Sequence, residues 1–302
     1  MKPILQEVER VIETASIALI VLLLPWSWAF RLLRFCTRFS FMRSPCADAA
    51  SAEAKKMGLG AQFLQVRLIS LHRLVDMADY FLTLKYGRGW MRRNVWVSGD
   101  ELPASTALAA PLFITFHYGQ GFWALRYFRD RGYPVAWLHA PPPLRAPWGE
   151  KFNSWMGRRR IAQVARLCGA PAIAVGGSIE RMRERLLKAQ RAVMAMPDAP
   201  LQPGQSSIDV RLLGQPARLP AGAIRMAVQA GVPVVIYSIV VDPITGRRNL
   251  RLEGPIQAVT AEALAQRLAD HLGSAIVADP SAWHVWPWAG SFFATEHGEA
   301  GR

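Results

Sequence analysis

The chain has 302 residues, of which 51% are hydrophobic and 19% are charged, and 36 basic against 22 acidic residues give a formal net charge of +14. This length suits one large α/β domain or two small ones, and the composition excludes a disordered chain. The basic excess favours an acidic partner such as nucleic acid, anionic lipid or an acidic carrier protein. Three scattered cysteines offer neither a metal spacing nor a disulfide framework, which favours a reducing compartment.

An uncharged apolar segment, Ala15–Phe30, lies near the N-terminus. It is shorter than the roughly 20 residues of a membrane-spanning helix. A basic stretch follows it, containing Arg31, Arg34, Arg38 and Arg43. The positive-inside rule then places the rest of the chain in the cytoplasm. We expect residues 1–44 to anchor the protein to a membrane, as a short span or as an interfacial helix with a basic flank, with a buried soluble helix as the alternative.

The remaining chain alternates between strand and helix patterns, as a parallel sheet covered by helices requires. Residues 45–60 favour a linker or a frayed helix start, and apolar spacing predicts one or two helices over Gln62–Lys85. The predicted strands are Leu108–Phe116, Pro134–Leu138, Ala170–Val175, Ala192–Met196 and Ile208–Leu213, followed by a hairpin of Val232–Val241 and Asn249–Glu253. The predicted helices are Gly121–Arg131, Lys151–Leu167, Ser178–Gln190, Leu219–Ala230 and Ala261–Ile276. We therefore predict an α/β fold over residues 45–302, with a central, mostly parallel sheet flanked by helices and an N-terminal membrane-anchoring helix.

The segment Pro111–Ala124 is the strongest candidate for a functional site. It delivers His117 to the expected C-terminal end of a strand, and Gly119 and Gly121 follow before the next helix. Ligands of α/β sheets bind at these strand ends. An imidazole there is well placed to act as a general base, because its pKa lies near neutral pH. The alternative is a histidine that caps a strand–helix turn in solvent.

Several segments in this order resemble the lipid A biosynthesis acyltransferases of the lysophospholipid acyltransferase superfamily. The resemblance rests on the N-terminal apolar segment with its basic flank and on the strand–histidine–helix unit at His117. It also rests on the phrases LLKAQRAVMAMPD, which ends at Asp198, VRLLGQPARLPAGAIRMAVQAGVPVV and the tail DPSAWHVWPW. The similarity runs from about residue 10 to residue 288, and the joint order of the motifs is more specific than any one of them.

The resemblance implies transfer of a fatty acyl chain from an acyl carrier protein or coenzyme A thioester to a hydroxyl of a lipid A-like or other glycolipid. His117 would be the base, and backbone N–H groups at Gly119 and Gly121 would stabilise the oxyanion. Gln120 and the basic residues Arg158, Arg159 and Arg160 would contact substrate or carrier protein; a solvated helix face is the alternative for the arginines. No metal or cofactor is implied, and the site would face the cytoplasm at a bacterial inner membrane.

The chain departs from the family motif, in which an acidic residue follows the histidine after four residues and orients the imidazole. Phe122 occupies that position here. Three interpretations stay open. Asp198 supplies the carboxylate from a neighbouring strand end; or His117 acts with only a backbone or Gln120 contact; or the protein has lost catalysis and binds lipid or carrier protein without acyl transfer.

Two other classes of protein fit less well. Gly119–Ala124 matches the dinucleotide pattern G-x-G-x-x-A, but His139 and Ala140 stand where that fold needs an acidic residue. Nucleic-acid binding would suit the charge, but no recognised motif accompanies it. The histidines lack metal-ligand spacing.

Overall fold

A seven-stranded sheet with the order β1-β9-β8-β2-β5-β3-β4 forms the centre of the protein. The computed structural model describes residues 2–39, 42–58, 64–139, 146–147, 149–174, 177–201 and 204–293. The strands of the sheet are β1 (Val95–Gly99), β2 (Leu112–Ile114), β3 (Val135–His139), β4 (Ile173–Ala174), β5 (Ala192–Ala195), β8 (Val234–Val241) and β9 (Arg248–Ile256). Neighbouring strands are parallel except β8 and β9. The prediction of a central, mostly parallel sheet is confirmed.

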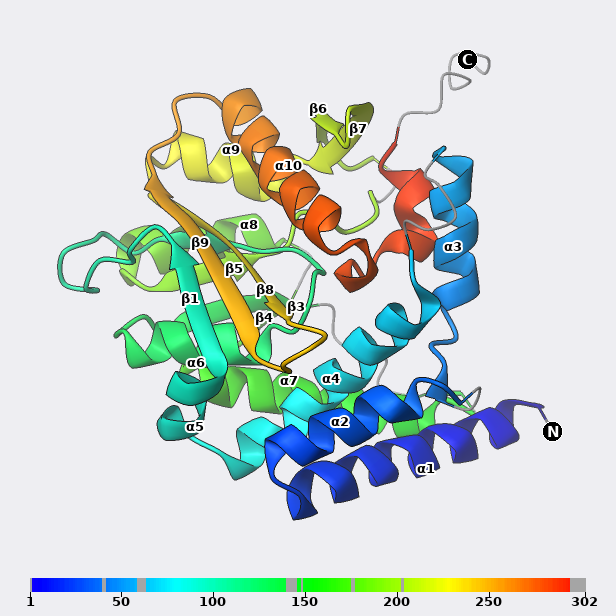
Figure 1. Ribbon diagram of the computed structural model, residues 1–302. Coiled ribbons are helices and arrows are strands. Elements are labelled where there is room, and N and C mark those ends of the chain that lie inside the picture. Colours follow the sequence, from blue (N-terminus) through cyan, green and yellow to red (C-terminus); the bar gives the residue numbers. More distant parts are fainter. Residues whose placement is uncertain are drawn as a thin grey trace.

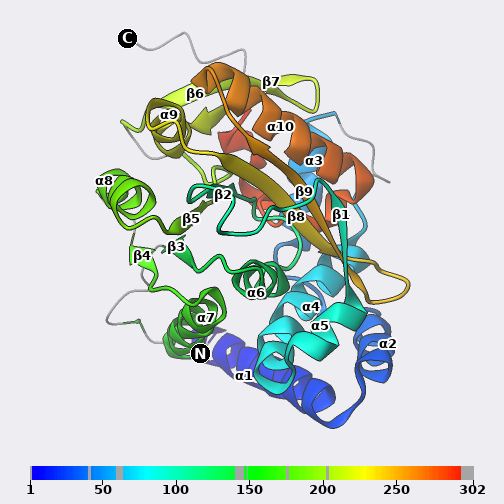
Figure 2. The ribbon, with the colours of Figure 1, turned by 90° about the vertical axis from the view of Figure 1, so that its left-hand side faces the viewer.

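Helices cover both faces of the sheet (Figures 1 and 2). Alternate residues of β2 point to opposite faces: Leu112 and Ile114 belong to one hydrophobic core, and Phe113 belongs to the other. The first core contains side chains of α3 (Ala47–Lys56), α8 (Ser178–Arg183), α9 (Gly222–Gln229) and α10 (Ala261–Ala278). The second contains side chains of α1 (Lys2–Leu23), α2 (Trp26–Cys36), α4 (Val66–Lys85), α5 (Arg88–Asn94), α6 (Phe122–Asp130) and α7 (Lys151–Cys168). Because both faces are buried, the central strands are apolar throughout, without a polar alternation.

Two predicted helices differ from the observed elements. The predicted helix Leu219–Ala230 begins too early, because Gln215–Pro220 is strand β7, paired antiparallel with β6 (Ser207–Leu212). Leu213 and Gly214 connect these strands with positive φ angles of 53° and 78°, the backbone of a tight hairpin turn. The helix predicted over Ser178–Gln190 changes to a π-helix, η2, over Glu184–Lys188.

Two elements, α5 and β1, lie where the sequence pattern indicates none, between Lys85 and Leu108. Helix α5 is too short to show a periodic pattern in the sequence. It is held by tertiary contacts, because the indole ring of Trp90 packs against the rings of Trp26 and Trp123. Part of residues 45–60, expected as a linker or a frayed helix start, forms α3, whose small side chains Ala47, Ala50 and Ala54 are buried. The proline-rich loop Ala140–Pro147 lies largely outside the described residues.

Pro25 divides the apolar N-terminal segment between two helices. Proline has no backbone N–H and suits a helix start, so α1 ends at Leu23 and α2 begins at Trp26. The chain turns back there, and the two helices lie side by side (Figure 1). No helix in the described part of the chain combines the length and apolarity needed to cross a membrane.

The predicted anchor segment, residues 1–44, packs against the α/β domain. Ile17 and Val21 of α1 are buried in the second core. Glu13 forms a hydrogen-bonded ion pair with Arg73 of α4, and the Glu7 carboxylate accepts from the Phe152 N–H at the start of α7 (2.6 Å). These contacts fix one face of α1 on α4 and α7.

A fully buried ion pair joins α4 to β9. The Arg248 guanidinium and the Asp79 carboxylate are both inaccessible to solvent and are hydrogen-bonded to each other. Arg248 also lies over the rings of Trp26 (4.2 Å) and Trp90 (5.2 Å), which come from α2 and α5. Burial raises the pKa of Asp79 to about 6, although Arg248 opposes the shift. The pair therefore ties four elements together at a considerable desolvation cost.

Replacing Asp79 with Asn should lower the free energy of unfolding by about 3–5 kcal/mol, because it leaves the Arg248 charge buried without a counterion. Urea denaturation at neutral pH measures this loss. The double replacement Asp79→Leu with Arg248→Met removes both charges and should recover most of the stability. As a matched control, Arg43→Gln breaks the exposed pair with Asp48 and should cost less than about 1 kcal/mol. A loss no larger for Asp79→Asn than for this control would contradict the prediction.

Candidate functional site

Strand register brings His117 and Asp198 to the same edge of the sheet. In the parallel pair of β2 and β5, Ile114 lies opposite Ala195. His117 follows Ile114 by three residues and Asp198 follows Ala195 by three, so the two chains leave the sheet side by side. The C-terminal edge of a parallel sheet is where ligands bind in this class of fold.

Asp198 is fully buried and accepts three hydrogen bonds. Its Oδ1 accepts from His117 Nδ1 (2.9 Å), and its Oδ2 accepts from the His117 backbone N–H (2.7 Å) and from Trp283 Nε1 (3.1 Å). Because Nδ1 keeps its proton and donates it in a hydrogen bond to the carboxylate, Nε2 of His117 is left as the proton-accepting nitrogen. Burial lowers the pKa of His117, but the Asp198 carboxylate raises it by more, so the net pKa lies above the ordinary value.

The turn after His117 is held by the C-terminal segment of the chain. The His284 N–H donates to the His117 carbonyl (2.8 Å), and His284 Nε2 donates to the Gly119 carbonyl (2.8 Å). The Gly119 N–H donates to the Ala282 carbonyl (2.9 Å). Gly119 has a φ of +67°, and a Cβ there would lie 1.8 Å from the Ile239 carbonyl oxygen. Only glycine fits this close approach of the turn to β8.

The two glycines therefore differ in what they offer to an oxyanion. The Gly119 N–H, predicted as a donor, already serves Ala282 and is not available to a substrate. Gly121 precedes α6, and its N–H has no acceptor among the described residues. A Cβ at Gly121 would meet no atom within 4 Å. The start of α6 at Gly121 is thus the remaining candidate for an oxyanion site.

His117 lines an apolar cavity of about 410 Å³. The wall includes the aromatic side chains Phe122, Trp137 and Tyr237 and the methionines Met194 and Met196. Gln120, predicted to bind substrate, does not line this cavity: it is fully buried, donates to His72 Nδ1 (3.1 Å) and accepts from the Val241 N–H (2.8 Å). Its amide is occupied in holding the turn. In the described part of the chain, no three His, Cys, Asp or Glu side chains group as metal ligands would.

The arginine triplet of α7 divides between the cavity and the outer surface. Arg160 lies in the cavity wall, where it pairs with Asp76 (2.6 Å) and lies over the Phe122 ring (5.0 Å). Arg158 and Arg159 are exposed: Arg158 donates to Ser154 Oγ (2.8 Å), and Arg159 lies over the ring of Trp155. One helical turn thus contributes to two different surfaces.

Sequence reasoning missed Asp76, Trp283 and His284 as parts of the site. Asp76 comes from α4, far from the His117 motif in sequence, and nothing in its neighbourhood marks it. Trp283 and His284 belong to the tail phrase DPSAWHVWPW, which carried a family signal but no indication of its contact with His117.

A histidine that is hydrogen-bonded to a carboxylate, beside an apolar cavity at the C-terminal edge of an α/β sheet, has the chemistry needed to act as a general base on an apolar substrate. Residues 151–286 match the family described as bacterial lipid A biosynthesis acyltransferase. This match supports, over this region, the resemblance to the lipid A biosynthesis acyltransferases predicted from the sequence. The matched region contains Asp198, Arg160 and His284 and ends before the tail does; His117 precedes it. No curated protein gives a significant match to the chain.

The raised pKa of His117 should depend on Asp198. In Asp198→Asn the carboxylate is lost while the burial remains, so the His117 pKa should fall below its value in the unaltered protein. Titration of the ring by NMR measures this shift. Because folding raises the pKa of His117, the pair with Asp198 stabilises the folded state. This stabilisation is complete below the unfolded histidine pKa of about 6.5 and is lost as the pH rises through the higher pKa of the folded state. An unchanged His117 pKa in Asp198→Asn would contradict the assignment.

Proposed function

We propose that this protein transfers a fatty acyl chain from a thioester to a hydroxyl of a glycolipid acceptor. The observation that carries the proposal is the His117–Asp198 pair on the wall of an apolar cavity. An alcohol is a weak nucleophile, and a histidine held by a carboxylate is a common means of activating it. The carboxylate expected five residues after His117 is replaced in this role by Asp198.

The proposed reaction needs one base that acts twice. His117 Nε2 removes the proton of the acceptor hydroxyl as its oxygen attacks the thioester carbonyl carbon. The carbonyl oxygen becomes negative and is stabilised by N–H groups at the start of α6, beginning with Gly121. The carbon–sulfur bond then breaks, and His117 returns its proton to the leaving thiolate. Asp198 holds the ring and stabilises the imidazolium in between.

The cavity suits the hydrocarbon chain of the donor. Its side chains are mainly apolar, and it opens beside His117, so an acyl chain placed there would bring its carbonyl carbon to the base. The Arg160–Asp76 pair supplies polar groups on the same wall. We propose acyl carrier protein or coenzyme A as donor, with no further cofactor, and a lipid A-like or other glycolipid as acceptor.

We further propose that α1 and α2 attach the protein to the cytoplasmic face of a bacterial inner membrane. Large apolar side chains are exposed along both helices although one face of α1 is packed on α4 and α7. They are Ile4, Leu5, Val8, Val11, Ile12, Leu19, Leu22 and Leu23 on α1, and Trp28, Leu32 and Phe35 on α2. An exposed apolar face of this extent, next to Arg31, Arg34 and Arg38, is typical of a helix pair lying in a membrane interface.

His117→Ala should lower turnover roughly 100- to 10,000-fold, the usual contribution of a general base. Asp198→Asn should lower it less, and should have little further effect in the His117→Ala background because the two side chains act as a unit. Transfer of a radiolabelled acyl chain to extracted membrane lipids, followed by mass spectrometry, measures these rates. Full acyl transfer by His117→Ala would exclude the mechanism. Absence of transfer in the unaltered protein, with retained lipid or carrier binding, would favour the alternative of a catalytically altered family member.

Arg158 and Arg159 should assist docking of an acidic carrier protein. Reversing both to Glu should raise the KM for the carrier-linked donor at least about tenfold at low salt, with little change in kcat, because long-range attraction acts on association. Steady-state kinetics at low and high salt measure this effect, and a coenzyme A thioester provides a donor without the protein surface. Equal KM values for variant and unaltered protein at low salt would contradict the role.

A further inference from the structure

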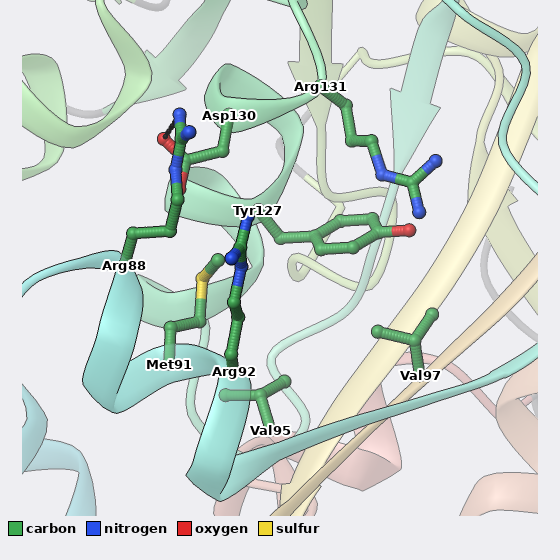
Figure 3. Close-up of a pocket in the computed structure, with 8 residues that line it drawn as sticks. All are labelled: Arg88, Met91, Arg92, Val95, Val97, Tyr127, Asp130 and Arg131. Carbon is green, nitrogen blue, oxygen red and sulfur yellow. Dashed lines mark hydrogen bonds and ion pairs between the residues drawn. The ribbon is translucent and has the colours of Figure 1, made fainter.

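A second cavity lies beside the end of α6, and Figure 3 shows the residues that line it. It has a volume of about 300 Å³ and is lined by α5, by the beginning of β1 and by the last residues of α6 and the position after it. The His117 cavity touches α6 at Phe122 and Leu125, whereas this one touches it at Tyr127 and Asp130. The two linings have no residue in common, so the two cavities are separate sites.

Positive charge is concentrated around this second cavity. Its lining includes Arg88, Arg92 and Arg131, and an adjoining cavity that shares Arg88 and Asp130 adds Arg126 and Arg129. Asp130 is the single carboxylate in either lining. It pairs with Arg88 through two hydrogen bonds of 3.0 and 3.1 Å and with Arg126 at 4.0 Å, so five arginines share one carboxylate. Arg92, Arg129 and Arg131 are exposed and so accessible to an anion, and guanidinium groups bind phosphate oxygens in a planar, two-pronged geometry.

Helix-end electrostatics explain part of this cluster. Arg129 donates to the Arg166 carbonyl in the last turn of α7 (2.6 Å), and Arg131 lies over the Tyr127 ring (5.3 Å) at the end of α6. Arg92 lies in the last turn of α5, is exposed and makes no ion pair with any described residue. Figure 3 shows Arg92 and Arg131 on two sides of Tyr127, with Val95 and Val97 beside the space between them.

The walls of the cavity combine charge with apolar surface. Met91, Val95 and Val97 line it together with the arginines. Trp96, between the two valines in β1, is 69% exposed. An anionic group attached to a hydrocarbon matches this combination, whereas a free anion would leave the apolar wall uncovered. Tryptophan is also enriched at the headgroup level of membranes.

One wall of this cavity, helix α5, packs against the helix pair that we propose lies on the membrane. Trp90 of α5 contacts Trp26 of α2, with ring centroids 6.1 Å apart. Just before α5, Lys85 Nζ donates to the carbonyls of Val21 (3.3 Å) and Leu22 (2.8 Å) at the end of α1. The helix that carries Arg88 and Arg92 is therefore joined to α2 through Trp90, and Lys85, which precedes it in the chain, is joined to the end of α1.

We propose that the cavity between α5, β1 and the end of α6 binds the phosphate-bearing headgroup of an anionic membrane phospholipid. The proposal rests on the membrane position assigned to α1 and α2 and adds a specific lipid contact to it. The site is separate from the acyl-transfer site, because the two cavities have no lining residue in common. It fixes the protein's orientation on the membrane by combining the apolar helices with one charged pocket.

Binding of the full-length protein to lipid vesicles tests the proposal. The test variant is Arg92→Gln with Arg131→Gln, and the matched control is Arg218→Gln with Arg225→Gln, which removes equal charge from exposed positions on β7 and α9. Those elements lie at the opposite end of the molecule from α1 and α2 (Figure 1). On vesicles of phosphatidylcholine with phosphatidylglycerol, the test variant should bind roughly 10- to 30-fold more weakly than the unaltered protein and the control by less than about threefold.

Vesicles of phosphatidylcholine alone separate the two parts of the proposal. Binding to these uncharged vesicles measures the contribution of the apolar face of α1 and α2 alone. If all variants bind them equally, the loss on anionic vesicles comes from the charge of the cavity, as proposed. If the two double variants lose anionic-vesicle binding equally, the cavity is not a lipid site and only net charge acts. If inorganic phosphate or an acidic carrier protein binds the unaltered protein and not the test variant, while vesicle binding is the same for both, the assignment to a phospholipid is wrong. The activity of His117→Ala, which tests the proposed reaction, does not enter any of these outcomes.

Discussion

The Asp198 carboxylate, buried without access to solvent, is the constraint around which the site is built. A charge can be removed from water only if hydrogen-bond donors replace the water, and three N–H groups do so here. Two belong to His117 after β2 and one belongs to Trp283 near the end of the described chain. The same carboxylate therefore joins β2, β5 and the C-terminal segment at one point. Any displacement of one segment would leave a buried charge short of a donor.

That constraint also explains why the C-terminal segment is part of the site. His284, next to Trp283, binds the carbonyls of His117 and Gly119 and so fixes both ends of the turn between them. On the other side of the turn, Gln120 is held by His72, which in turn donates to Asp279 (2.9 Å). Asp279 begins the segment that contains Trp283, so this chain of hydrogen bonds ends in the same C-terminal segment that binds Asp198. Hydrogen bonds thus hold the turn that carries His117 from two sides, and the Asp198 carboxylate holds the ring itself.

The sequence predicted the sheet, most helices and the residue pair more accurately than the individual polar contacts. Periodicity identifies buried strands and the strand ends at His117 and Asp198, and the βα alternation implies that these ends share one edge. Local patterns do not determine which nitrogen or carbonyl a side chain reaches. Gln120 was expected to face substrate but is buried in the turn. Strand β8, which neighbours β2 in the sheet, passes close enough for the Val241 N–H to donate to its side chain. The division of Arg158 and Arg160 between two surfaces follows from the packing of α7 on α4, which the sequence of α7 alone does not contain.

Phe122 illustrates how a replaced motif residue can leave the arrangement of the site intact. Its ring is buried, lies against Tyr80 (centroids 6.3 Å apart) and carries the Arg160 guanidinium on its face. Asp198 already accepts the hydrogen bond from Nδ1–H of His117. An acidic side chain at position 122 would therefore find no free N–H on the neutral imidazole. It would instead lie near Arg160 and compete with Asp76 for it. The aromatic residue keeps Arg160 paired with Asp76 in the cavity wall, so the two carboxylates of the site serve different cations: Asp198 the histidine and Asp76 the arginine.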